Sequence, residues 1–244
     1  MKILFVCPVL DIRYEWFLGF IEIQKQLSKH EVTYYIPYRK PVHIVENIQG
    51  RKAIEGNFDY VLTMNDDIWD VPDNTVEKLI GANKDFISCV MYAHGFPYQR
   101  CAFLKENKEH SLIDIADKHI SALKEVTGTG IIAVDFSSSP FTLIKTEVFR
   151  KIPQPWYEFT ETVPSDNYFC QKMLDNGIQP YVDMDLQVTH RGITFWNRTQ
   201  RFLADCEFMI AMGQMDKNHI KYPSYEIVRD RLIDSYTKKK LLVL

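Results

Sequence analysis

Short apolar segments alternate with amphipathic segments through the first half of the chain. Residues 2–7, 58–64 and 86–92 are short, mostly apolar runs, each of a length typical of a buried strand. Between these runs, apolar residues recur at helical spacing. The alternation predicts a mostly parallel sheet with helices on both faces, which defines an α/β fold. The predicted helices cover residues 16–27, 42–54 and 74–80, and residues 31–36 form one further predicted strand.

The second half of the chain is less regular. Residues 112–123 have helical spacing within a polar segment, and residues 131–136 predict a strand. A turn at 137–140 precedes residues 142–152, which we expect to form a short helix or a strand–helix junction. A helix over residues 165–177, ended by Gly177, and a strand over 180–188 follow, and the pattern is helical again from about Arg198. We therefore expect one domain over residues 1–197 and a C-terminal helical extension over 198–244.

Composition narrows the class of protein. The chain has 244 residues, a formal net charge of -3 and 46% hydrophobic residues, which is typical of a globular protein and not of a dedicated nucleic-acid binder. Its five cysteines are scattered and contain no C-x-x-C pair, so we expect buried free thiols and a reducing, cytoplasmic location. No stretch is long and apolar enough to cross a membrane, although peripheral membrane association stays open. The basic residues near the C-terminus are either a solvated end or a surface for an anionic acceptor.

The strongest local signal is the cluster Asn65–Asp66–Asp67 directly after the predicted strand 58–64. In open α/β sheets, ligands bind at the carboxyl ends of the strands. Two adjacent carboxylates there repel each other, and a divalent cation that also binds phosphates would offset their charge. The alternative is structural, because turns rich in Asn and Asp also cap helices.

Two further residues are placed to take part in chemistry. Asp166 falls in the first turn of the helix predicted from residue 165, where it is either a stabilising charge at the helix terminus or a general base. His190 follows the strand 180–188 and is either a structural hydrogen-bonding group or a metal ligand, with His94 as the rival candidate. An imidazole beside carboxylates favours Mn²⁺ over Mg²⁺.

These pieces together resemble the GT-A glycosyltransferases, especially family-2-like members. The resemblance covers about residues 1–195 and rests on an ordered set of short motifs. They are Phe5–Val–Cys–Pro8, Asn65–Asp–Asp67, Phe141–Thr–Leu–Ile–Lys–Thr–Glu–Val–Phe149, Pro155–Trp–Tyr157, Ser165–Asp166 and Thr189–His190. In this family the acidic strand end is a DxD-type motif that binds the metal and the donor diphosphate. The implied fold is a Rossmann-like, mostly parallel sheet flanked by helices.

The resemblance implies a role for individual residues. Asp67 and His190 correspond to metal ligands, and Asp166 corresponds to the base that deprotonates the acceptor hydroxyl in inverting members. The chain departs from the family pattern twice: Asn65 replaces the first acidic residue of a strict DxD, and Ser165 replaces the usual glutamate before the base. The remaining implied contacts are to the donor by Pro8, Asp11, Arg51, Asn65 and Asp66, and to the acceptor or donor sugar by Trp156 and Tyr157.

The implied activity is transfer of a sugar from a nucleotide-sugar donor, a UDP- or GDP-sugar, to an acceptor hydroxyl with inversion. The acceptor stays open among a saccharide, a lipid-linked sugar, a protein and a modified nucleic acid. One alternative is a nucleotidyltransferase acting on sugar phosphates, although the loop after the first strand lacks the glycines of a phosphate-binding loop. A second alternative is a carbohydrate- or nucleotide-binding module without turnover, because a fold does not guarantee a function.

Overall fold

The computed structural model describes residues 1–10, 14–93, 99–118, 122–139, 141–160, 163–191 and 195–196. The chain divides into two compact units, Met1–Thr194 and Phe195–Leu244. In the second unit only the short strand β13 (Phe195–Trp196) is described. The helical extension predicted over residues 198–244 lies outside the described residues.

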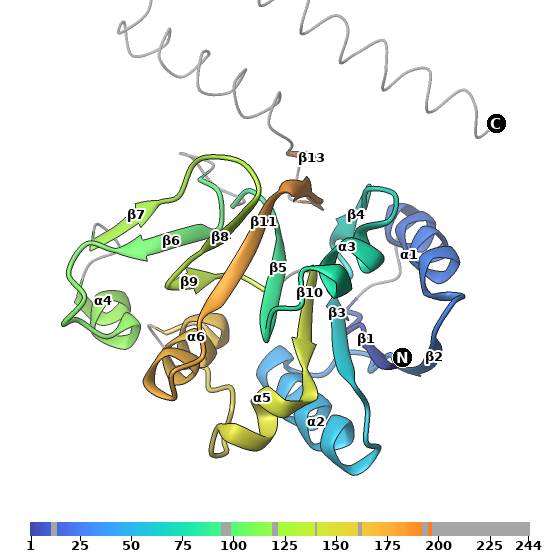
Figure 1. Cartoon of the computed structure of the whole chain (residues 1–244), viewed down its shortest axis with the longest axis horizontal. Helices are drawn as coiled ribbons and strands as arrows, with labels where there is room; N and C mark the ends of the chain where they lie inside the picture. The colour runs from blue at the N-terminus through green and yellow to red at the C-terminus, as the bar shows by residue number, and fades with distance from the viewer. Residues whose placement is uncertain are drawn as a thin grey trace, which may run out of the picture. The chain divides into compact units, whose positions relative to one another are not determined.

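The central sheet of the first unit contains β1 (Lys2–Val6), β2 (Glu31–Tyr35), β3 (Tyr60–Met64), β5 (Phe86–Val90), β8 (Ile131–Ala133), β10 (Phe141–Lys145) and β11 (Pro180–Gln187). Their order across the sheet is β2-β1-β3-β10-β5-β11-β8 (Figure 1). The pairs β1–β2, β1–β3 and β5–β11 are parallel, whereas β10 and β8 run antiparallel to their neighbours. The sheet is mostly parallel, and this confirms the predicted α/β class.

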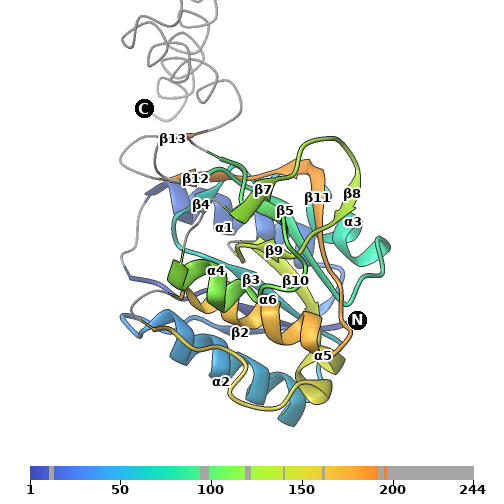
Figure 2. The same ribbon diagram turned by 90° about the vertical axis from the view of Figure 1, so that its left-hand side faces the viewer.

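Helices cover both faces of this sheet. They are α1 (Tyr14–Leu27), α2 (Val42–Glu55), α3 (Thr75–Gly81), α4 (Leu112–Lys118), α5 (Thr146–Lys151) and α6 (Ser165–Asp175). Figures 1 and 2 show α1 and α3 on one side of the sheet and α2, α5 and α6 on the other.

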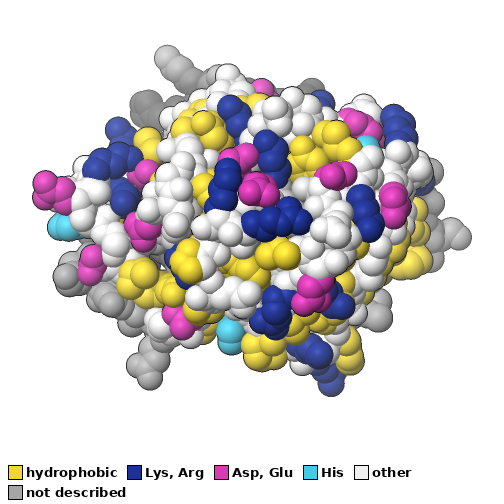
Figure 3. Space-filling model, turned by 60° about the horizontal axis from the view of Figure 1, so that its bottom comes forward, with side chains coloured by type: hydrophobic (Ala, Val, Ile, Leu, Met, Phe, Trp, Pro, Cys, Tyr) yellow, Lys and Arg dark blue, Asp and Glu magenta, His cyan; other side chains and the backbone are white. Residues whose placement is uncertain are grey.

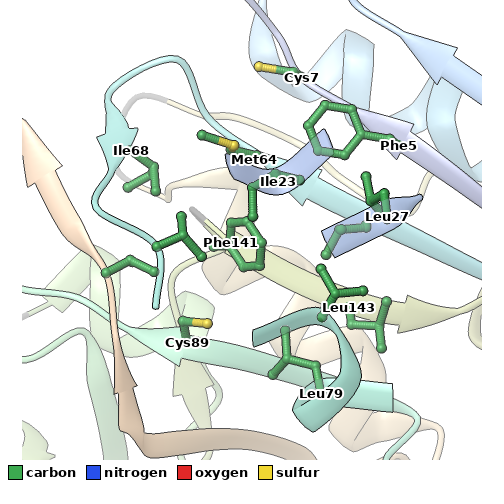
Figure 4. Packing of buried hydrophobic residues seen from close by; sticks show 14 of the residues in the cluster. Phe5, Cys7, Ile23, Leu27, Met64, Ile68, Leu79, Cys89, Phe141 and Leu143 are labelled. Carbon is green, nitrogen blue, oxygen red and sulfur yellow. The ribbon is translucent and has the colours of Figure 1, made fainter. Parts of the chain in front are cut away.

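Successive side chains of β1 belong to different hydrophobic clusters. Ile3 and Phe5 pack with residues of α1 and α3, and Figure 4 shows part of this cluster around Phe5. Leu4 and Val6 pack with residues of α2, α5 and α6. Because both faces are buried, residues 3–6 of the strand are all apolar, as expected for parallel strands covered by helices. That is why this strand appears in the sequence as a nearly continuous apolar run.

Shorter strands lie beside the central sheet. Strand β4 (Ile68–Trp69) pairs antiparallel with β12 (Thr189–Arg191). Strand β6 (Ala102–Lys105) pairs antiparallel with β7 (Leu123–Glu125) and β9 (Phe136–Ser137).

Two sequence predictions are corrected here. The helical spacing over residues 112–123 ends in α4 at Lys118, and Leu123 begins the strand β7 instead. The single strand predicted over 131–136 is divided into β8 and β9, which belong to different sheets. In both cases the pairing partner lies far away in the sequence, and local spacing contains no information about it.

Other predictions from local chemistry are confirmed. Gly177 has φ +72, a left-handed conformation that favours glycine, and it stands two residues after the end of α6. The four described cysteines are free thiols, and Cys7, Cys89 and Cys170 are buried as predicted, whereas Cys101 is only partly buried. Within the described residues, no helix combines the length and apolar composition that a bilayer crossing requires.

Candidate functional site

The acidic turn Asn65–Asp66–Asp67 follows β3 at its carboxyl end, as predicted, and all three residues are partly buried. The Ile68 backbone N–H donates to the Asn65 carbonyl oxygen at 3.2 Å and so closes the turn. The Leu10 backbone N–H donates to Asp66 Oδ2 at 2.6 Å. The loop after β1 is therefore attached to the acidic turn, and the carboxyl ends of the two neighbouring strands form one edge.

His190 reaches this edge from the distant end of the chain. It lies in β12, directly opposite Ile68 of β4, because the two short strands pair antiparallel. His190 Nε2 lies 3.0 Å from Asp67 Oδ2, and the side chains are 9% and 27% exposed. The structure thus brings together the two residues that the sequence predicts as metal ligands, although 123 positions separate them.

The hydrogen bond of His190 Nδ1 determines how Nε2 can interact with Asp67. His190 Nδ1 lies 3.1 Å from the Tyr92 carbonyl oxygen. A carbonyl oxygen only accepts, so Nδ1 carries a proton and donates it. With Asp67 ionised, two arrangements of Nε2 remain. In one, Nε2 carries a second proton and donates it to the carboxylate as part of an imidazolium. In the other, Nε2 is unprotonated, and a cation binds both its lone pair and the carboxylate. Histidine ligands of metals commonly have this second hydrogen bond to a carbonyl.

The spacing of the two side chains fits a metal ion. Ligand atoms about 2.1 Å from a six-coordinate ion lie about 3 Å from their nearest neighbours, and the Nε2–Oδ2 distance is 3.0 Å. Among the described residues, however, no group of three or more His, Cys, Asp or Glu side chains is arranged to hold a metal ion. Asp67 and His190 therefore fit as two of the ligands of an ion that binds further oxygens from a ligand or from water.

Asp166 is attached to the same edge through backbone contacts. Its Oδ2 accepts a hydrogen bond from the Ser139 N–H at 3.1 Å. Thr63 Oγ1, in β3 two residues before Asn65, donates to the Ser139 carbonyl oxygen at 3.4 Å. Because β10 runs antiparallel to β3, the segment that enters β10 lies at the carboxyl end of β3.

The surroundings of Asp166 suit a base. Burial raises the pKa of Asp166 from 3.8 to about 6, and the hydrogen bond from the Ser139 N–H opposes this rise only in part. The first turn of a helix also favours a charged carboxylate, and burial outweighs that effect here. A carboxylate with a pKa near 6 is ionised at neutral pH and still accepts a proton readily.

Two buried polar residues of α2 are not among the site residues that the sequence predicts. Glu46 and Gln49 lie on the buried side of α2, where their spacing looks like one side of an ordinary helix. The side chain of Glu46 interacts with Ser165 and Asp166. Polar residues at core positions of an amphipathic helix were the available signal, because buried carboxylates are rare without a partner.

Three predicted ligand-binding residues are not brought to this edge. Trp156 and Tyr157 are each 1% exposed and pack in the hydrophobic cluster with α2 and α6. Trp156 Nε1 donates to the carbonyl oxygens of Phe149 and Ile152, so its polar atom also points into the protein. Arg51 is exposed near the C-terminal end of α2, and this end leads to the amino end of β3, at the opposite edge.

Some of the remaining predicted residues lie within the described residues and others lie outside them. Pro8 is partly buried and begins the loop that reaches Asp66. Cys7, just before it, accepts a hydrogen bond from Trp16 Nε1 at 3.2 Å, and burial raises its pKa to about 12. Asp11 and the rival metal-ligand candidate His94 lie outside the described residues.

A surface cavity of about 410 Å³ lies at the opposite edge of the sheet and includes none of the predicted site residues. Figure 3 shows the molecule with its lower side turned forward, and basic side chains there are interspersed with acidic ones. The cavity is lined by both basic and acidic side chains, so it has no single sign of charge that would select a phosphate. Its lining residues are Met1, Phe58, Asp59, Tyr60, Lys145, Thr146, Glu147 and Arg150.

Comparisons with known proteins bear on the fold. No protein-family model matches the chain, and no curated protein sequence matches it. The solved structure of A197 from STIV is similar with a TM-score of 0.52 and 18% identity, over 79% of this chain and 86% of that chain. At this identity the likeness concerns the fold alone.

Other solved structures resemble the chain more distantly. GalNAc-T7, crystallised with UDP, GalNAc and Mn²⁺, has a TM-score of 0.47 and 11% identity, and the match covers 78% of this chain and 42% of that chain. A 4-diphosphocytidyl-2C-methyl-D-erythritol synthase from Anaerococcus prevotii DSM 20548 has a TM-score of 0.41 and 11% identity, over 85% of this chain and 96% of that chain. Glycosyl and nucleotidyl transferases are thus both among the similar structures.

Proposed function

We propose that the protein is a metal-dependent glycosyltransferase that moves a sugar from a nucleotide-sugar donor to an acceptor hydroxyl. The observation that carries this proposal is the meeting of Asp67 and His190 within 3.0 Å at the carboxyl edge of a mostly parallel sheet. Ligands of open α/β sheets bind at this edge. The ordered motifs that resemble those of GT-A glycosyltransferases support the same proposal.

Asp67 and His190 would hold the metal ion, and the donor diphosphate would complete its ligands. An oxygen-rich set with one imidazole suits Mn²⁺ better than Mg²⁺. When bound, the ion supplies positive charge that stabilises the departing diphosphate. Asp66 and Pro8 lie where the loop after β1 meets the acidic turn, and they would border the donor.

Asp166 would act as the base. The acceptor oxygen forms a bond to the anomeric carbon while the bond from that carbon to the diphosphate oxygen breaks. The electrons of the broken bond go to the diphosphate, and the proton of the acceptor hydroxyl goes to Asp166. A base beside the acceptor implies direct displacement, and the product is expected with inverted configuration, which NMR of the product measures.

The test of the metal site uses calorimetric titration of UDP- and GDP-sugars with and without Mn²⁺. We expect Asp67→Asn and His190→Gln to abolish the Mn²⁺-dependent part of donor binding. Glu147→Gln is the matched control, since Glu147 is an exposed carboxylate at the opposite edge, paired with Arg150. Donor binding unchanged in both site variants would refute the metal assignment.

Two outcomes would select a different function. Formation of a nucleotide sugar from a sugar phosphate and a nucleoside triphosphate would identify a nucleotidyltransferase. Binding of Mn²⁺ and a nucleoside diphosphate without any transfer or hydrolysis of a donor would identify a binding module. Incubation of the wild-type protein with each substrate set distinguishes these cases.

A further inference from the structure

A second carboxyl group lies beside Asp166 in the interior. Glu46, on the buried side of α2, is 7% exposed, and its carboxyl group interacts with the side chain of Ser165. Ser165 is the first residue of α6 and directly precedes Asp166. Glu46 and Asp166 interact electrostatically across this contact. Two helices that are far apart in the sequence thus bring the buried carboxyl group of Glu46 next to the partly buried one of Asp166.

Within the part of the chain that the structure describes, no neighbouring cation offsets the charge of this pair. The titratable groups that face it are Tyr157, from the segment after α5, Cys170 of α6, and Cys101, which precedes β6. Burial raises the pKa of this phenol and of both thiols, so all three are neutral at neutral pH. Among the described residues, no lysine or arginine acts as a charge partner of either carboxyl group.

The two carboxyl groups differ in how well they accommodate a charge. Asp166 is partly exposed and accepts the Ser139 N–H, which stabilises a carboxylate. Glu46 Oε2 is buried and has no hydrogen-bond partner. An ionised oxygen without a donor in the interior is costly. Two carboxylates that share a site also cannot both ionise easily, and burial together with the charge of Asp166 raises the pKa of Glu46 well above 4.5.

We propose that Glu46 is a positioning residue that stays a neutral carboxylic acid beside Asp166, so that the pair holds one proton and Asp166 carries its negative charge. The neutral acid fills the space on the inner side of Asp166 and keeps water out without adding a second charge. The base thereby stays in a weakly solvated environment that offsets the effect of the helix terminus. The catalytic part of this inference rests on the proposed role of Asp166.

The location of the proton is measured by the pH dependence of unfolding, which needs no transfer activity. Glu46 releases its proton near pH 4.5 when unfolded and keeps it when folded, so the wild type loses stability as pH rises through this range. Glu46→Gln removes this loss. The ratio of the unfolding equilibrium constant of Glu46→Gln to that of the wild type should fall about tenfold for each pH unit above 4.5, as long as folded Glu46 stays protonated.

Asp166→Asn is the matched comparison. Because folded Asp166 ionises at about 6, the relative stabilisation of this variant should level off above that pH. Above pH 6, urea unfolding should therefore show a gain that still grows for Glu46→Gln after the gain for Asp166→Asn has become constant. A gain for Glu46→Gln that levels off at a lower pH than the gain for Asp166→Asn would overturn the assignment of the proton to Glu46.

The positioning role is measured by the pH profile of kcat. Glu46→Gln should keep the acid limb of the wild type near pH 6, since a neutral amide replaces a neutral acid. Glu46→Ala admits water beside Asp166, and its acid limb should move below that of the wild type. If Glu46 had only a structural role, the pH of the acid limb would be the same in both variants as in the wild type. If the acid limb of Glu46→Gln moved down by one pH unit or more, Glu46 would be the group that carries the charge. Absence of transfer by the wild type would instead refute the proposed function, and the unfolding measurement would still test the pair.

Discussion

Replacing Asp166 with asparagine tests whether burial of the charged Asp166 carboxylate destabilises the folded protein. Asparagine has nearly the same shape, and its carbonyl oxygen can still accept the Ser139 N–H. The change removes the charge and retains the hydrogen bond. We therefore expect a variant that is more stable than the wild type and much less active.

The magnitude follows from the pKa of Asp166. Its rise from 3.8 to about 6 on folding corresponds to about 3 kcal/mol, at about 1.4 kcal/mol per unit. The folded pKa lies above the unfolded one, so this stability is present below pH 3.8 and is lost as pH rises through about 6. Asp166→Asn should equal the wild type at the acidic end and exceed it by up to about 3 kcal/mol at pH 8.

Urea unfolding at several pH values between 4 and 8 measures the gain. Turnover with the donor identified by calorimetry should fall about 10²–10⁴-fold, while donor affinity stays near that of the wild type. An Asp166→Asn variant that gains nothing between pH 4 and pH 8 would refute the argument that burial destabilises the charged base. A near-normal rate would exclude Asp166 as the base.

Two further predictions concern the packing that holds the site. A Cβ at Gly50 would lie 2.7 Å from Trp156 Cε3 and 2.9 Å from Phe149 Cδ1, so Gly50→Ala should destabilise by about 1–3 kcal/mol despite its better helix propensity. In thermal unfolding, the control Gly81→Ala should be neutral or stabilising, since a Cβ at Gly81 meets nothing within 4 Å; equal effects would contradict the packing argument. The Asn47 side chain accepts a hydrogen bond from the Trp156 backbone N–H at 2.9 Å and donates one to the Tyr157 carbonyl oxygen at 2.6 Å. Asn47→Ala should lower the free energy of unfolding by about 1–3 kcal/mol, because it leaves these two backbone groups unpaired. Calorimetric unfolding of Asn47→Ala within 0.5 kcal/mol of the wild type would show that water replaces Asn47 there.

Much of the candidate site was predictable because it lies where strands end. Residues that follow a buried strand are delivered to a sheet edge, and this rule places Asp66, Asp67 and His190 from sequence alone. The contact between Asp67 and His190 itself depends on the pairing of β4 with β12. Both strands are too short to leave a clear alternating pattern, so that contact was expected only through a family resemblance.

Short motifs proved a weaker guide for aromatic and basic residues. Trp156 and Tyr157 follow a proline in a pattern shared with sugar-binding sites, yet their rings pack in the core. A large aromatic ring satisfies either role, and burial is decided by the neighbours that the fold supplies. Arg51 lies on a helix close in sequence to the acidic turn, but the direction of α2 takes it toward the other edge.

By itself, the sequence determined the alternation of buried strands and amphipathic helices, the positions of the acidic turn and of Gly177, and the free thiols. These features depend on local periodicity and local backbone chemistry, which adjacent residues encode. Only the tertiary structure decided that His190 meets Asp67, that Ser139 holds Asp166, and that Glu46 lies beside it. Each of these contacts joins residues from separate elements, and the pKa of a buried carboxyl group depends on burial and neighbours that exist only after the chain has folded.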